Sequence, residues 1–111
     1  MMQVITWQDV AAEKMGTGVA RRVLIGAKEG APNFVLRHFT VEAGACSPHH
    51  EHAWEHEVFI LSGKGVLVGP EGDQDLKPGE AAFVPGGVKH QFRNEGKEPL
   101  TFLCIVPLAG A

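Results

Sequence analysis

Short runs of apolar residues, several of them alternating with polar residues, follow one another along this chain and are separated by glycine and proline. Strands of this length with frequent turn residues are typical of an all-β barrel or sandwich. We expect strands at residues 21–25, 34–41, 55–61, 65–68, 80–84, 90–93 and 100–106. Residues 7–14 form the one candidate helix, with Asp9 as its cap, while residues 62–65 and 69–73 have turn composition.

Composition narrows the class of protein. A chain of 111 residues has the usual length of one domain with one core. Its net charge of −3 and the lack of a lysine or arginine cluster argue against nucleic acid binding. We see neither an apolar run of membrane-spanning length nor a signal peptide, so we expect a cytoplasmic protein without membrane contact. Cys46 and Cys104 are too few for a disulfide framework.

Four histidines form the clearest chemical pattern, in the order His50-x-His52-x3-His56 and then His90. Neutral imidazole is the commonest metal ligand in proteins. Residues two apart on a strand point to the same side, so His50 and His52 can reach one ion. His49 has the opposite parity, and His38 lies on another strand; we expect His49 to face outward and His38 to be structural or exposed.

Two stretches that contain these histidines resemble the two signature motifs of the cupin superfamily, and the resemblance covers residues 33–107. The first motif is G-x5-H-x-H-x3or4-E-x6-G, and residues 44–63 fit it except at one position. Six residues before Gly63 stands His56, where the family has glutamate. The second motif is G-x5-P-x-G-x2-H-x3-N, and this chain matches it without a gap through Gly79, Pro85, Gly87, His90 and Asn94.

The resemblance implies a single-domain cupin, that is, an all-β double-stranded β-helix or jelly-roll barrel. We assign the barrel and its metal site to residues 33–107, N-terminal edge strands to residues 1–32 and a tail to residues 108–111. A single small barrel leaves open strand edges that need a cover. We therefore predict a homodimer, in which residues 4–25 face the partner.

The histidine at position 56 is similar to the pattern of small cupins that bind metal through four histidines. We predict that His50, His52, His56 and His90 bind one divalent transition metal per chain. Strand parity supports His56, although both faces of its strand carry apolar residues. The alternative is three histidines with Glu57 or Glu55. Imidazole ligands suit Zn, Cu, Fe and Ni, and the family resemblance adds Mn.

Strand parity also predicts the surroundings of the metal. Phe92 shares a face with His90, and Ile60 shares one with His56. Phe102 and Cys104 share a face on the last strand. The predicted wall is mostly apolar and consists of Ile60, Phe92, Phe102 and Cys104. Arg37 alternates with apolar residues, and an inward arginine is costly unless it is paired. We interpret Arg37 as a group that holds a substrate carboxylate or enolate. The alternatives are an outward Arg37 or one paired with a structural glutamate.

The resemblance implies several activities, and the residues exclude some. The chain has no tyrosine, which argues against cupin sugar epimerases, and His56 in place of glutamate argues against the oxalate-degrading cupins. We favour a metal-dependent oxidoreductase, a dioxygenase that uses O2 on a small, enolisable or aromatic and possibly anionic substrate. The alternatives are a sugar-acid isomerase or lyase with the metal as Lewis acid, or a cupin that binds a small molecule without turnover.

Overall fold

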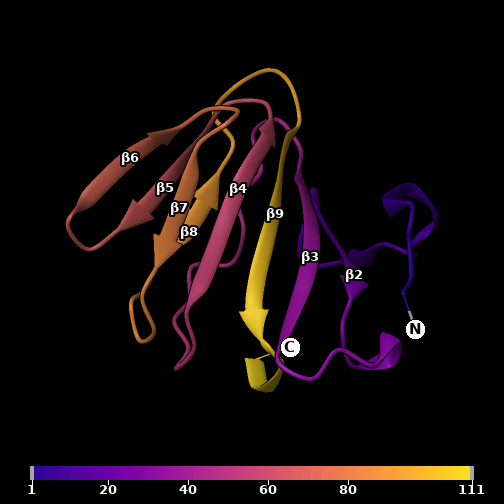
Figure 1. Ribbon diagram of the computed structural model, residues 1–111. Coiled ribbons are helices and arrows are strands. Elements are labelled where there is room, and N and C mark those ends of the chain that lie inside the picture. The colour runs from indigo at the N-terminus through magenta and orange to yellow at the C-terminus, as the bar shows by residue number, and fades with distance from the viewer. Residues whose placement is uncertain (1, 111) are drawn as a thin grey trace.

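A computed structural model describes residues 2–110. Within this range, nine strands form two antiparallel sheets that face each other (Figure 1). The larger sheet has the order β1-β2-β3-β9-β4-β7 and the smaller one the order β6-β5-β8. The strands of the larger sheet are β1 (Glu13–Lys14), β2 (Val19–Ile25), β3 (Phe34–Val41), β4 (His56–Ser62), β7 (Ala81–Val84) and β9 (Leu100–Pro107). Those of the smaller sheet are β5 (Gly65–Gly69), β6 (Gly72–Leu76) and β8 (Gln91–Arg93). The predicted all-β jelly-roll class is confirmed.

The core lies between the two sheets because the central strands alternate. Most inward residues on β3, β4 and β9 are buried and apolar, and they pack with Phe92 from β8 and Leu76 from β6. The buried apolar residues of these three strands are Val35, Val41, Val58, Ile60, Leu100, Phe102, Cys104 and Val106. Such alternation on a sheet with one covered face produces a single core that ends where polar residues begin.

Two predictions of local structure are wrong, and one strand was missed. Residues 7–14 are not a helix: only the single turn η1 (Trp7–Asp9) is helical, and the side chain of Asp9 does not cap it. Glu13 and Lys14 instead pair as β1 with the backbone of β2, because that edge offers free hydrogen-bonding groups. Strand β2 starts at Val19 rather than at residue 21. The turn predicted within residues 69–73 is present at Pro70 and Glu71, but Gly72 and Asp73 already belong to β6, a strand that was not predicted and that pairs with β5 in a hairpin.

Two features tie the ends of the barrel together. Asn94 of the second motif is fully buried, and its Nδ2 donates to the carbonyls of Val41 and Glu98 at 2.8 Å each. Its Oδ1 accepts a hydrogen bond from the backbone N–H of Gly96. On the outer face, the ring of Trp7 stacks on His38 with centroids 4.1 Å apart. His38 is therefore buried outside the cavity described below, in a structural position.

The remaining helical elements are single turns, η2 (Ala27–Glu29) and η3 (Leu108–Gly110). No helix in the described part of the chain is long and apolar enough to cross a membrane.

Candidate metal centre

The backbone brings the two histidine motifs together at one end of the barrel. His50 and His90 form a β-bridge, in which each backbone N–H donates to the other residue's carbonyl, at 3.2 and 3.0 Å. The N–H of Gly87 donates to the carbonyl of His52 at 2.7 Å. Gly87 has a φ of 78°, a left-handed conformation that glycine adopts at little cost. Pro85 ends β7 just before this turn.

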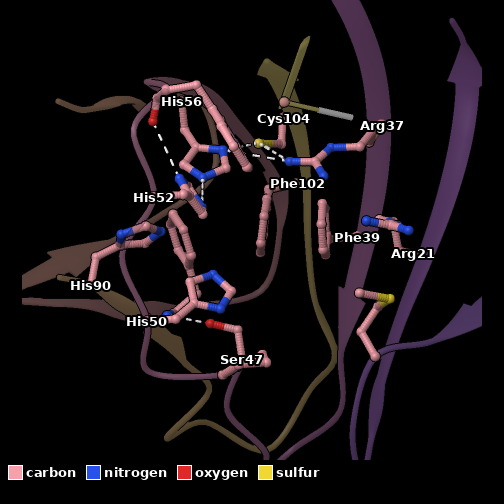
Figure 2. Close-up of a pocket in the computed structure, with 15 residues that line it drawn as sticks. Arg21, Arg37, Phe39, Ser47, His50, His52, His56, His90, Phe102 and Cys104 are labelled. Atoms are coloured by element: carbon pink, nitrogen blue, oxygen red, sulfur yellow. Dashed lines mark hydrogen bonds between the residues drawn. The ribbon is translucent and has the colours of Figure 1, made fainter. Parts of the chain in front are cut away.

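One imidazole nitrogen from each of His50, His52 and His90 lies within 4.8 Å of the other two. His56, the first residue of β4, adds a fourth ring, whose Nε2 lies 2.8 Å from Nε2 of His52. Two nitrogens that bind one ion at about 2.1 Å and at right angles to each other are about 3 Å apart. Figure 2 shows all four rings around one space. The spacing therefore fits a transition metal, with three histidines in a compact cluster and His56 beside it.

The ring nitrogens that point away from this space have partners of their own. Nδ1 of His90 lies 2.9 Å from the carbonyl of Val88, and Nδ1 of His52 lies 3.2 Å from that of Trp54. Nδ1 of His56 lies 3.1 Å from Sγ of Cys104. A hydrogen on Nδ1 of His52 and of His90 leaves the Nε2 lone pair free for a metal, which is how outer partners orient histidine ligands. Nη2 of Arg37 also lies 3.5 Å from Nδ1 of His56.

The two glutamates that we considered as alternative ligands do not lie in this space. Glu55 and Glu57 are exposed and line a separate depression on the outer side, next to Phe34 and Ile105. Strand alternation places Glu57 opposite to His56. Two backbone carbonyls and a thiol, rather than carboxylates, lie next to the outer nitrogens of the histidine rings. As expected, His49 is exposed.

Burial keeps the inner imidazoles neutral. Desolvation is the main reason that the pKa of His56 is lowered from 6.5 to about 3, and the nearby His52 and Arg37 lower it further. Desolvation also lowers the pKa of His90, while its bond to Val88 opposes the shift. The pKa of Cys104 is raised by burial, so its side chain is a neutral thiol. Histidine binds metal only in its neutral form, and the folded barrel favours that form.

A cavity of about 180 Å³ opens beside the histidines and is mainly apolar (Figure 2). Of the predicted wall, Phe92, Phe102 and Cys104 line it. The prediction for Ile60 is wrong. Ile60 shares the inward face of β4 with His56, but it lies four residues further along the strand and is fully buried in the core.

Sequence reasoning missed several residues that line the cavity. They come from β2, β3, the loop before β4 and the ends of the chain: Met15, Arg21, Phe39, Ser47, Pro48, Trp54 and Gly110. Phe39 shares strand parity with Arg37, which was the available signal. Arg21 depends on the register of β2 against β3, where it pairs with Phe39, and no pattern in the sequence specifies that pairing.

Arg37 points into the cavity and is only 6% exposed. Its Nη2 donates to Sγ of Cys104 at 3.3 Å, and its guanidinium lies 5.1 Å from the ring centre of Phe39. Its Nε is buried and has no hydrogen-bond partner. Among the described residues, the ion pairs found are Arg21–Glu13 and Arg93–Glu95. Neither alternative for Arg37, an outward side chain or one paired with a glutamate, is what the structure shows.

The structure is a small jelly-roll barrel with a histidine cluster at one end. Comparison of the sequence with known protein families identifies the family to which such a barrel belongs. Residues 37–106 match the cupin domain family. The chain belongs to this family.

Three relatives show the range of functions. The polyketide cyclase RemF from Streptomyces resistomycificus is 35% identical and has a TM-score of 0.89, with 97% of this chain and 80% of that chain covered. The 1-methylthio-D-xylulose 5-phosphate methylsulfurylase of Rhodospirillum rubrum is 37% identical over 71 residues, which are 64% of this chain and 46% of that protein. The chain thus matches less than half of the methylsulfurylase. The oxalate-binding protein of Thermotoga maritima is 27% identical over 107 residues, 94% of this chain and 88% of that protein.

Proposed function

We propose that this protein is a metal-dependent enzyme that acts on a small ketone whose α-hydrogens are acidic. One divalent transition metal per chain is held by His50, His52, His56 and His90. The observation that carries the proposal is the set of neutral imidazoles beside an apolar cavity that contains a buried arginine without a counter-ion. When bound, the metal would polarise a carbonyl group as a Lewis acid.

The relatives support this substrate chemistry. The names of the polyketide cyclase and of the methylsulfurylase both refer to compounds that carry ketone groups. A ketone oxygen can bind a positive centre, and the adjacent C–H bonds then become more acidic. The common element of these two names is therefore a substrate that forms an enolate.

The protein's own groups limit which ketones can react. No aspartate or glutamate is found among the described residues that line the cavity, and the chain has no tyrosine. Burial raises the pKa of Cys104, so this residue is a neutral thiol and provides little thiolate to accept a proton. Because the four histidines of the lining are assigned to the metal, the described residues of the cavity offer no free general base. We infer that the substrate is already acidic, as a 1,3-dicarbonyl compound is, and that water or the substrate itself accepts the proton.

The other residues bind and enclose the substrate. Phe92 and Phe102 pack against each other with ring centres 4.7 Å apart, and Phe39 stacks on Phe102 at 5.2 Å. This wall excludes water and so strengthens electrostatic interactions inside the cavity. Arg37 binds the negative end of the substrate through its guanidinium.

A dioxygenase is the second candidate function. Four neutral ligands leave the full charge of a divalent ion uncompensated, and an octahedral ion would keep two positions for exogenous ligands. The apolar wall would also protect reactive oxygen species from water. Both functions require the same ligands, but only the dioxygenase consumes O2.

The first experiment measures metal content in protein purified without an affinity tag. His90→Ala should lower it sharply, and the double variant His52→Ala/His90→Ala should bind almost none; stoichiometric metal in the double variant would disprove the site. His49→Ala, an exposed neighbour, is the matched control. His56→Ala tests the fourth ligand separately.

The second experiment follows exchange of α-hydrogens for deuterium by NMR, in 1,3-diketones and hydroxyketones without oxygen. Exchange that exceeds the rate with His90→Ala protein supports the proposal. Oxygen uptake with enols, catechols or activated alkenes, in the absence of such exchange, would instead support the dioxygenase. Tight binding without either reaction would indicate a binding protein.

A further inference from the structure

A second arginine faces the cavity beside Arg37. Arg21 lies on β2 and pairs with Phe39 on β3, while Arg37 on β3 pairs with Val23 on β2. Arg21 and Arg37 are therefore diagonal neighbours on one face of the sheet, a spacing that long side chains can bridge. In Figure 2, Arg37 lies close to Cys104 and His56, and Arg21 lies on the side of Phe39 away from the histidines.

The two arginines have more hydrogen-bond donors than the protein satisfies. Arg21 donates through Nη2 to Oε2 of Glu13 at 3.2 Å, but its buried Nε has no partner. Nε of Arg37 also has none, and the acceptors near its Nη2 are Sγ of Cys104 at 3.3 Å and Nδ1 of His56 at 3.5 Å. Leaving buried donors and a buried charge unpaired costs free energy. An anionic ligand with several acceptor oxygens would remove this cost.

The charges specify the kind of anion. Arg21 and Arg37 contribute two positive charges and Glu13 one negative charge, which leaves a net charge of +1. A monoanion would neutralise this positive charge, whereas a dianion would leave the group with an excess of negative charge. The planar guanidinium group matches the two oxygens of a carboxylate. The cavity, at about 180 Å³, is smaller than the roughly 300–1,000 Å³ of pockets for drug-sized ligands.

We infer that Arg21 and Arg37 form a subsite for one carboxylate group on the wall of the cavity, next to His56. The substrate class that follows, which rests on the proposed function, is a small keto acid. Its carbonyl reaches the histidine cluster, its carboxylate reaches the two arginines, and its apolar or aromatic body lies against Phe39, Phe92 and Phe102. Arg21 binds through guanidinium N–H groups other than the buried Nε, while its Nη2 stays with Glu13.

The test uses metal-loaded protein and three probes of one shape: benzoate, the neutral benzamide and the dianionic phenylphosphonate. Calorimetry gives their affinities for the wild type, Arg37→Met and Arg21→Met, after metal content is measured for each. Benzoate should bind about 10- to 100-fold more weakly to Arg37→Met, and several-fold more weakly to Arg21→Met. Benzamide binding should stay unchanged. Arg93→Met removes an exposed arginine that pairs with Glu95 and should not alter benzoate binding.

Equal benzoate affinity in the wild type and Arg37→Met, or no millimolar binding to the wild type, overturns the subsite. Stronger binding of phenylphosphonate than of benzoate, with loss in both arginine variants, overturns the assignment to a monocarboxylate. If Arg37→Met does not fold, Arg37→Lys keeps the charge but loses the planar fork, and it should still weaken benzoate binding. Arginine-dependent benzoate binding without ketone exchange would retain the subsite and reject the proposed enzyme. Hydrogen exchange in neutral diketones without arginine-dependent benzoate binding would support the proposed enzyme and reject the subsite.

Discussion

Acid should destabilise the metal-free protein through His56. In the folded protein the pKa of His56 is lowered to about 3, mainly by desolvation, whereas in the unfolded chain it is near the ordinary value of 6.5. Because the folded pKa is the lower one, the unfolded state binds the proton more readily. The contribution of His56 to stability is complete above pH 6.5 and is lost as the pH falls toward 3.

The magnitude follows from the two pKa values. Each pH unit between them corresponds to about 1.4 kcal/mol. Between pH 7 and pH 5 the unfolded imidazole takes up its proton while the folded one does not, so His56 alone should lower the free energy of unfolding by about 2 kcal/mol. This is a substantial part of the stability of a small domain, which is about 5–15 kcal/mol.

Urea denaturation of chelator-treated protein at pH 7 and pH 5 measures this effect. His56→Gln keeps a polar side chain that does not titrate, so its pH dependence should be smaller than that of the wild type by about 2 kcal/mol. His49→Gln, at an exposed position, should behave like the wild type. The same pH dependence in His56→Gln and in the wild type would show that His56 titrates normally in the folded protein, and the argument for a buried neutral imidazole would fail.

Three further predictions concern the cavity and assembly. Gly110→Ala should weaken metal binding about 10-fold, because its Cβ would collide with the Trp54 ring, which stacks on His52 at 4.5 Å; competition with a chelating dye measures this, and Gly69→Ala is the control. Arg37→Ala should raise the apparent KM for an anionic substrate more than it lowers kcat, and a pure loss of kcat in steady-state kinetics would contradict a binding role. Light scattering should give twice the chain mass of 11.9 kDa for the homodimer with residues 4–25 facing the partner, and a monomer mass at micromolar concentration would rule it out.

Much of the barrel could be predicted from local sequence. Strands β3, β4 and β9 alternate strongly enough to indicate both their existence and their inward faces, because burial of one face imposes a period of two. Glycine and proline indicated the turns. Strand β6 was missed because its residues are mostly polar and exposed. Strand β1 was missed because a strand of two residues is too short to show an alternating pattern.

The histidine motifs by themselves determined which residues are the candidate metal ligands, since their spacing is local to two short segments. The tertiary structure decided what surrounds them. Register between β2 and β3 brought Arg21 next to Arg37, packing placed Ile60 in the core rather than in the cavity wall, and the paths of the chain ends carried Met15 and Gly110 to its rim. These positions depend on pairing between segments far apart in the chain, and strand alternation specifies the face of a residue but not its neighbours across the sheet.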